Sequence, residues 1–209
     1  EGTRPTLPWS PRISLAPQAA LPLLDHLHAD PTRYVTRSVA NHLNDLAKID
    51  PELVLHRLSQ WQQAGRQQPQ ELDFITRHAL RSLIKQGHPE TLRFLGYPAS
   101  PSIQITNFGL AADQVLLGQA LRFELEIKAS QATRLVVDYL IHFQNKQGKL
   151  KPKVFKLKNL DLEAGQVVKL QKQHPLRVMT TKALYPGQHH LELQINGQSY
   201  AKLAFELVT

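Results

Sequence analysis

The chain has 209 residues, no cysteine and a formal net charge of +8 at pH 7. The absence of cysteine excludes disulfides and thiolate metal sites, and no apolar run approaches the roughly 18–20 residues of a membrane-spanning helix. The charge favours polyanionic partners, nucleic acid first, over a membrane. Nine of the arginines lie in residues 1–100 and eleven of the lysines in residues 101–209, so we expect two domains that use positive charge differently.

The opening residues, EGTRPTLPWSPRISLAPQ, are rich in proline and predict an ordered loop rather than a helix. The chain begins at Glu1 without a methionine, inside this predicted loop, as expected of a fragment or a processed form.

Four dipeptides that end in proline, at 30–31, 50–51, 68–69 and 88–89, predict the starts of helices, because proline fits the first helical turn. The predicted helices cover residues 21–28, 31–48, 51–62, 69–86 and 89–95. They alternate in length with a period of forty, and YVTRSVANHL from Tyr34 corresponds to FITRHALRSL from Phe74. This period is typical of HEAT-like repeats, which we predict for residues 1–97.

Beyond residue 101 the apolar residues recur at every second position, which is the period of a β-strand. Turn sequences separate the strands, and INGQS is a strong hairpin signal between the last two. The pattern predicts an immunoglobulin-like β-sandwich over residues 101–209, with the domain boundary near 97–101. The seven predicted strands cover residues 103–110, 121–129, 134–144, 154–162, 166–172, 188–195 and 200–208.

The predicted helix 31–48 has two faces. Val35, Val39, Leu43 and Leu46 fall on one face and are expected to be buried. The opposite stripe consists of Arg33, Arg37, Asn41, Asn44, Asp45 and Lys48, and the next repeat carries Asp73, Arg77, Arg81 and Lys85 at the same spacing. Stacked repeats would place these stripes side by side, where forked donors can hold phosphates. An ordinary solvated helix surface is the alternative.

Asp45 is the exception in this stripe, because a carboxylate weakens phosphate binding. It is either a salt-bridge partner of Arg37, Asn41 or Lys48, or a reactive group that faces a cationic centre of the substrate.

Six lysines lie in one predicted hairpin, between Lys146 and Lys158. Lys149, Lys151 and Lys153 are candidate DNA contacts, and protection of an exposed edge strand is the alternative.

The ten histidines show no spacing suited to metal ligation. His26 and His28 point to different faces of a helix, and His189 and His190 point to opposite faces of a strand. No metal and no cofactor are therefore expected, and His42 is interpreted as a half-buried structural histidine. Motifs for nucleotide hydrolysis or acyl transfer do not occur in the sequence.

The segments EGTRPTLPW, RSVANHLNDLAK and TRHALRSLIKQG closely resemble bacterial AlkC-type DNA alkylation-repair glycosylases, relatives of the AlkD type. The resemblance covers essentially the whole chain, because some members carry an immunoglobulin-like domain after their helical repeats. It implies a metal-free, monofunctional and monomeric enzyme that excises cationic N-alkylated bases, such as 3-methyladenine and 3-methylcytosine, from double-stranded DNA. The implied location is the bacterial cytoplasm, at the nucleoid.

Family members have further repeats before the first of these motifs. The resemblance therefore implies that the chain is the C-terminal portion of a larger repeat array, with an inactive truncated form as the alternative.

The resemblance also implies roles for single residues. Glu1 and Asp45 match the acidic positions of the motifs and are the candidate catalytic carboxylates, because a carboxylate stabilises an oxocarbenium-like state and orients water. Trp9 is the candidate lesion contact, since its ring attracts a cationic base by about 0.5–2 kcal/mol. The candidate DNA-binding residues are Arg4, Arg33, Arg37, Asn41, Asn44, Arg77, Arg81, Lys85, Lys149, Lys151 and Lys153. A non-catalytic DNA-binding or scaffold protein built on the same repeats is the alternative function, and Asp45 distinguishes the two.

Overall fold

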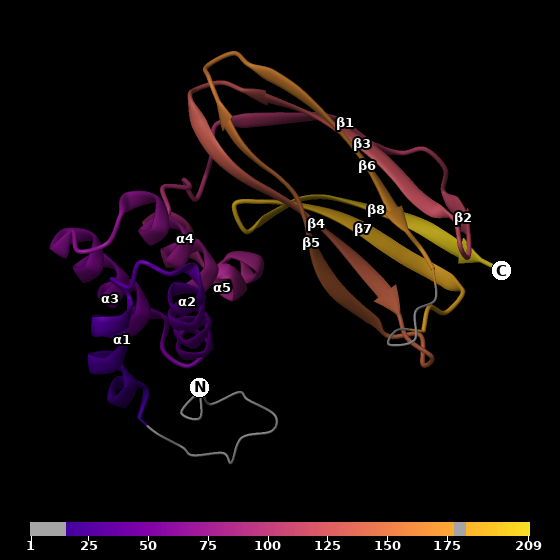
Figure 1. Cartoon of the computed structure of the whole chain (residues 1–209). Coiled ribbons are helices and arrows are strands. Elements are labelled where there is room, and N and C mark those ends of the chain that lie inside the picture. Colours follow the sequence, from indigo (N-terminus) through magenta and orange to yellow (C-terminus); the bar gives the residue numbers. More distant parts are fainter. Residues whose placement is uncertain (1–15, 178–182) are drawn as a thin grey trace. The chain divides into compact units, whose positions relative to one another are not determined.

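The structure is a computed structural model, which describes residues 16–177 and 183–209. The chain divides into two compact units, with the boundary between Phe94 and Leu95. The first unit is helical and the second consists of strands, which is the order predicted from the two periods of the sequence (Figure 1).

Proline and its preceding residue begin several of the helices. Asp50 caps α3, where its Oδ1 accepts a hydrogen bond from the N–H of Leu53 at 2.9 Å and Pro51 occupies the first position. Gly65 ends the same helix in the left-handed conformation, with φ of 60°. The helical elements are η1 (Pro17–Ala20), α1 (Leu21–Leu27), α2 (Arg33–Ala47), α3 (Pro51–Ala64), α4 (Pro69–Ala79), α5 (Arg81–Gln86) and α6 (Pro89–Phe94).

Helix α2 begins later than the predicted residue 31. Asp30 does not cap the helix directly, because its Oδ1 accepts hydrogen bonds from the N–H and the hydroxyl of Thr32, at 2.8 and 2.5 Å. These bonds close a turn, and α2 starts at Arg33.

The predicted helix 69–86 is two helices, α4 and α5, which meet at Leu80. Leu80 has φ of −91° and ψ of 2°, outside the helical region, although its side chain is fully buried. The side-chain amide of Asn44 donates to the carbonyl of Ala79 at 2.8 Å, so a side chain of α2 satisfies a carbonyl at the break. Apolar periodicity continues through the break and therefore did not reveal it.

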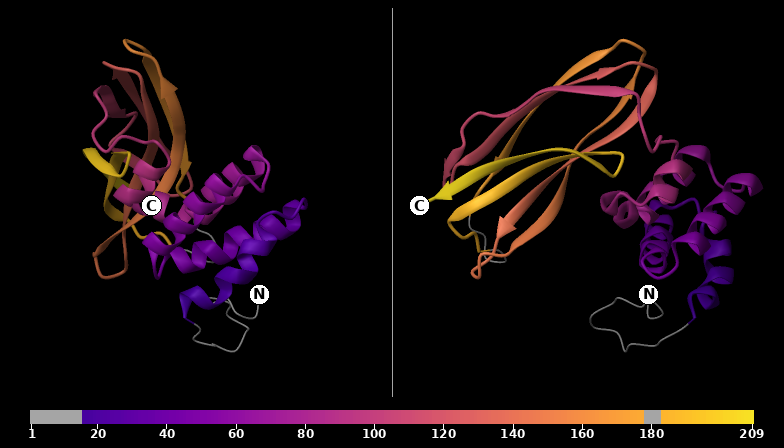
Figure 2. Two further views of the ribbon diagram at one scale, coloured as in Figure 1. Left: turned by 90° about the vertical axis from the view of Figure 1, so that its left-hand side faces the viewer. Right: turned by 180° about the vertical axis from the view of Figure 1, so that it is seen from behind.

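The core of the helical unit lies where α2 packs against α4 and α3. Val39 and Leu43 of α2, Leu58 of α3 and Ile75 of α4 are almost completely buried there. Figure 2 shows these helices from two further sides.

The second unit is a sandwich of two sheets that face each other as layers (Figures 1 and 2). One sheet has the strand order β1-β3-β6 and the other has the order β2-β8-β7-β4-β5. Alternate side chains of both sheets fill the space between them, among them Leu125, Ile127, Val137, Ile141 and Leu193. The strands are β1 (Ile103–Leu110), β2 (Gln114–Leu116), β3 (Ala120–Ala129), β4 (Thr133–Gln144), β5 (Leu150–Leu162), β6 (Val167–Pro175), β7 (Gly187–Ile195) and β8 (Gln198–Val208).

Two details of this unit bear on the sequence predictions. Strand β2, which pairs in parallel with β8, was missed, because three residues are too few to show a period. The hairpin predicted from INGQS is confirmed: Asn196 and Gly197 have φ of 47° and 77°, as a two-residue turn between β7 and β8 requires.

Candidate nucleic-acid interface

The outward face of α2 presents Tyr34, Arg37 and Asn41, and Lys48 follows on the same side at the C-cap; the four residues recur at intervals of three to seven. Tyr34, Arg37 and Lys48 are exposed and Asn41 is half-buried. The opposite face is buried, as predicted, except that Val35 is only half-buried. The periodicity of the sequence thus identified the buried face of this helix, but Asn44 and Asp45 of the predicted outward stripe are buried as well.

His78 of α4 links this face to the next repeat. Its Nε2 pairs with Asn41 Oδ1 at 2.9 Å, with the imidazole as donor, and its ring stacks on Phe74. Burial lowers the pKa of His78, and the positive charges of Arg81 and Arg37 lower it further. Both guanidinium groups therefore lie within electrostatic range of one imidazole. We call Arg37, Asn41, His78 and Arg81 the basic face.

His78 is not among the residues predicted for the site, although it lies inside the motif TRHAL. The available signal was its position four residues after Phe74 and one after Arg77, on the side of α4 that meets α2. An anion bound between Arg37 and Arg81 would offset the repulsion between their positive charges and a protonated His78. It would therefore favour protonation of His78.

Arg33 joins the two repeats rather than extending freely into solvent. Its guanidinium donates to both carboxylate oxygens of Glu71, at 2.6 to 3.0 Å, and lies 3.7 Å from the centre of the Phe74 ring. The Thr36 hydroxyl also donates to Glu71, and the Arg33 hydrogen bond is the main cause of the lowered pKa of that carboxyl. This position fits a clamp between α2 and α4 better than a phosphate contact.

Asn44 differs from the exposed position expected of a phosphate contact. Its side chain is only 1% exposed. Besides the bond to Ala79, its Oδ1 accepts a hydrogen bond from the Ser82 hydroxyl at 3.1 Å. Asn44 therefore holds α2 against the break between α4 and α5.

Asp45 is also buried, at 3% exposure, and forms an ion pair with Lys48, whose Nζ lies 2.8 Å from Oδ1. Of the salt-bridge partners considered from the sequence, the structure selects Lys48. The pair fixes the orientation of the carboxylate, because Lys48 is the C-cap residue of α2, three positions after Asp45.

The remaining candidates of the helical unit occupy different environments. Arg77 forms an ion pair with Asp73 at 2.8 Å, one turn earlier on α4. Arg81 is half-buried and donates to the carbonyl of His78, and Lys85 is exposed. Glu1, Arg4 and Trp9 lie outside the described residues.

The three candidate lysines of the β unit lie at the edge of the five-stranded sheet. Strand β5 is the last strand of that sheet and pairs with β4 along its whole length. Lys149, Lys151 and Lys153 are exposed, and Lys153 Nζ lies 5.4 Å from the centre of the Phe155 ring. Either phosphate binding or edge protection is compatible with this placement.

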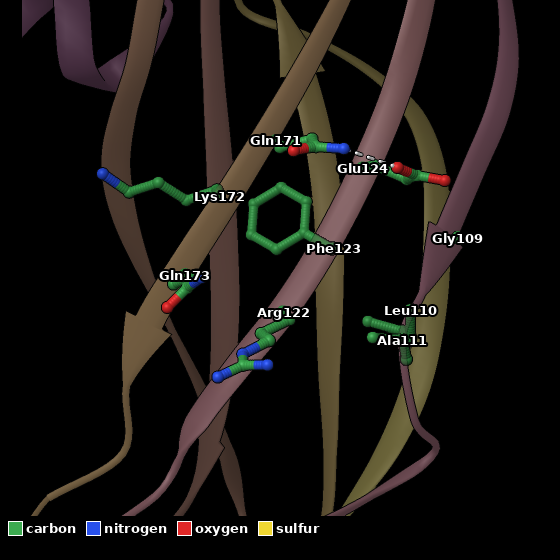
Figure 3. A pocket seen from close by; sticks show the side chains of 9 residues that line it. All are labelled: Gly109, Leu110, Ala111, Arg122, Phe123, Glu124, Gln171, Lys172 and Gln173. Carbon is green, nitrogen blue, oxygen red and sulfur yellow. Dashed lines mark hydrogen bonds between the residues drawn. The ribbon is translucent and has the colours of Figure 1, made fainter.

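A groove of about 580 Å³ lies on the three-stranded sheet, between β1, β3 and β6. Figure 3 shows the charged ends of Lys172 and Glu124 pointing to opposite sides of this groove, with a hydrogen bond between Gln171 and Glu124 at 3.1 Å. Because a carboxylate lines it beside Arg122, the groove is less suited to a phosphate than the basic face.

Among residues 16–177 and 183–209, no group of three or more His, Asp or Glu side chains is placed to hold a metal ion. In the same part of the chain, none of the helices has the length and apolar character needed to cross a membrane.

Comparison with known proteins adds three findings. Residues 104–209 match the family described as "Uncharacterised protein YhaZ, C-terminal Ig-like domain". The chain is 31% identical over 210 residues to the uncharacterized protein YhaZ of Bacillus subtilis (strain 168), with 99% of this chain and 58% of that protein aligned. It is also similar to Pseudomonas fluorescens alkylpurine DNA glycosylase AlkC bound to DNA containing an abasic site analog. That similarity has 37% identity and a TM-score of 0.93, and it covers 100% of this chain and 58% of that chain.

The chain therefore spans 58% of the length of each of these two relatives. The similarities confirm the resemblance to AlkC-type glycosylases and the predicted fold class, helical repeats followed by an immunoglobulin-like β-sandwich.

Proposed function

The chain belongs to the family of the YhaZ C-terminal Ig-like domain, and from this premise we propose that it acts as a DNA glycosylase that removes cationic N-alkylated bases from double-stranded DNA. The observation that carries the proposal is the similarity of the whole chain, helical unit included, to a DNA-bound alkylpurine glycosylase. We propose bases of the 3-methyladenine and 3-methylcytosine type as substrates and the bacterial cytoplasm, at the nucleoid, as the place of action.

In this proposal the basic face binds the DNA backbone. The positive charges of Arg37 and Arg81 both lower the pKa of His78, so one or two adjacent phosphates could neutralise both guanidinium groups. Lys85 adds a further exposed cation on α5, and Arg77 shares its charge between Asp73 and an incoming phosphate. These contacts address phosphates and carry no information on base sequence.

Asp45 is the proposed catalytic carboxylate. The glycosidic bond of a cationic base breaks through an oxocarbenium-like state, which a carboxylate stabilises while it orients a water molecule for attack. The buried position of Asp45 strengthens this effect, since charges interact more strongly away from bulk water. Glu1 is proposed as a second carboxylate and Trp9 as the contact to the cationic base.

The alternative is a DNA-binding or scaffold protein without catalytic activity. The ion pair between Asp45 and Lys48 favours it, because the pair supplies a structural reason for this carboxylate.

The test is release of methylated bases from alkylated duplex DNA by the chain and by its Asp45→Asn variant. We expect base release by the chain and a loss of at least about a hundredfold in the variant. Duplex affinity should be equal or higher in the variant, because a negative charge is removed. Glu90→Gln is the matched control: Glu90 forms the same kind of i,i+3 pair, with Arg93 on α6, and its replacement should leave base release unchanged.

Two outcomes would contradict this scheme. An Asp45→Asn variant that still releases bases would reduce Asp45 to a partner of Lys48. A chain that binds duplex DNA and releases no base would support the non-catalytic alternative.

A further inference from the structure

Tyr34 is 87% exposed, the highest value among the large apolar side chains that the structure describes. It lies in the first turn of α2, where a tyrosine ring gains nothing from the core of the repeat. Single exposed apolar residues are common, so exposure alone decides nothing. The neighbours of Tyr34 are what make it informative.

Tyr34 stands at the end of the basic face. Arg37 follows it by three residues and Asn41 by seven, so all three project from the same side of α2. Side chains three residues apart on a helix are neighbours, with about 5–6 Å between their Cβ atoms. A DNA strand whose phosphate is bound by Arg37 would therefore place a deoxyribose near the ring of Tyr34.

At the equivalent position of the next repeat, an aromatic ring is covered by other side chains and has a structural role. Phe74 lies forty residues after Tyr34, and its ring is covered by the Arg33 guanidinium and stacked on His78 at 5.3 Å. Phe74 thus serves the packing between the repeats and is half-buried. Tyr34 occupies the same position of the repeat with its ring open to solvent, and it carries a hydroxyl that Phe74 lacks.

We propose that Tyr34 is a DNA-contacting residue, whose ring packs on the deoxyribose beside the phosphate that Arg37 binds. The inference rests on the proposed DNA binding by the basic face. A tyrosine ring suits this place, because its apolar face covers the sugar carbons while its hydroxyl can donate to a phosphate oxygen. The contact carries no charge, and this property separates it from the arginine contacts in an experiment.

The test compares Tyr34→Ala, Tyr34→Phe and Arg37→Gln in a salt titration of duplex binding. Tyr34→Ala should weaken binding roughly fivefold to tenfold, the effect of removing about 50 Å² of apolar contact, at every salt concentration. The slope of log affinity against log salt should stay unchanged, because no counterion is released by an uncharged ring. Tyr34→Phe should stay within about threefold of the parent protein, since it keeps the ring.

Arg37→Gln should instead flatten the slope by about 0.9 for each phosphate that the guanidinium no longer neutralises. Leu23→Ala is the matched control, because Leu23 is a 62% exposed apolar residue on α1, a helix that contributes no residue to the basic face. Thermal unfolding should be the same for all four variants, since the three substituted side chains are exposed.

The outcomes separate this inference from the proposed function. Salt-dependent binding in which Tyr34→Ala behaves like Leu23→Ala would overturn the contact and leave the proposed DNA binding intact. A Tyr34→Ala variant with a flattened salt slope would also overturn it, because Tyr34 would then act by positioning Arg37. A chain without affinity for duplex DNA would overturn both proposals.

Discussion

His28 is buried between α1 and α3 with an unusual set of partners. Its ring stacks on Trp61 at 4.2 Å, and Nδ1 donates to the carbonyl of Asp25 at 2.9 Å. Nε2 is buried, and within the part of the chain that the structure describes it has no hydrogen-bond partner. Burial lowers the pKa of His28, and the positive charge of Arg66 acts in the same direction. Folding therefore favours the neutral form of this histidine.

This environment predicts that the helical unit is less stable in acid. With a lowered pKa in the folded state, the unfolded chain binds more protons, so the free energy of unfolding falls as the pH drops below the ordinary histidine value of about 6.5. His28→Phe should keep the ring stack on Trp61 and reduce this loss. Urea unfolding at pH 7.5 and 5.5, followed by circular dichroism at helical wavelengths, measures the difference. If parent and variant lose stability equally between the two pH values, the loss arises from other groups. His78 and His190 are examples, because burial also lowers their pKa values.

The sequence predicted the types of residue in the candidate site better than their exposure. Arg37 and Lys85 are exposed as expected, because helical periodicity alone determines which side of a helix they occupy. Asn44 lies at the border of the predicted stripe, and its burial depends on the break at Leu80, which leaves the Ala79 carbonyl for its amide. Pairings such as Arg33 with Glu71 join residues 38 positions apart and require the packing of α2 against α4 to be known.

At the scale of elements, the β4–β5 hairpin concentrates positive charge on one edge. The side chain of Asn145 holds its turn, since Oδ1 accepts hydrogen bonds from the N–H groups of Gln147 and Lys149, each at 2.9 Å. Lys151 and Lys153 then alternate with Pro152 along an edge strand. Proline and lysine on an edge both discourage pairing with another chain, which is the structural alternative to DNA binding.

Replacing Lys149, Lys151 and Lys153 with Gln decides between these roles. If the hairpin contacts DNA, as we expect, affinity should fall for all sequences, and the salt slope should flatten by about 0.9 for each phosphate that is no longer neutralised. The control is the same charge change on the three-stranded sheet, at Lys128, Lys169 and Lys172, which should have a smaller effect. Equal effects of both triple variants would show that affinity depends on net charge alone. No effect of the hairpin variant would show that its lysines protect an edge strand and do not contact DNA.

At the scale of the whole molecule, two periods in the sequence sufficed to predict helices followed by a β-sandwich. Backbone geometry produces these periods, 3.6 residues for a helix and 2 for a strand, so they persist whatever the elements pack against. Events set by packing were not predictable in this way: the break at Leu80 lies inside a continuous apolar pattern, and β2 depends on pairing with a strand about 90 residues later.

The net charge of +8 also belongs to the whole molecule, because arginines of the first unit and lysines of the second both contribute to it. We predict that duplex affinity is independent of base sequence and falls steeply with salt. We expect a slope of roughly −3 to −5 in log affinity against log salt. This range corresponds to phosphate contacts from most of six cations: Arg37, Arg81 and Lys85 of the helical unit and the three hairpin lysines. Fluorescence anisotropy with two unrelated duplexes of equal length, from about 50 to 200 mM salt, measures both properties. A flat salt response, or a tenfold preference for one duplex, would contradict backbone recognition, since phosphates are identical in every sequence and each phosphate contact releases counterions.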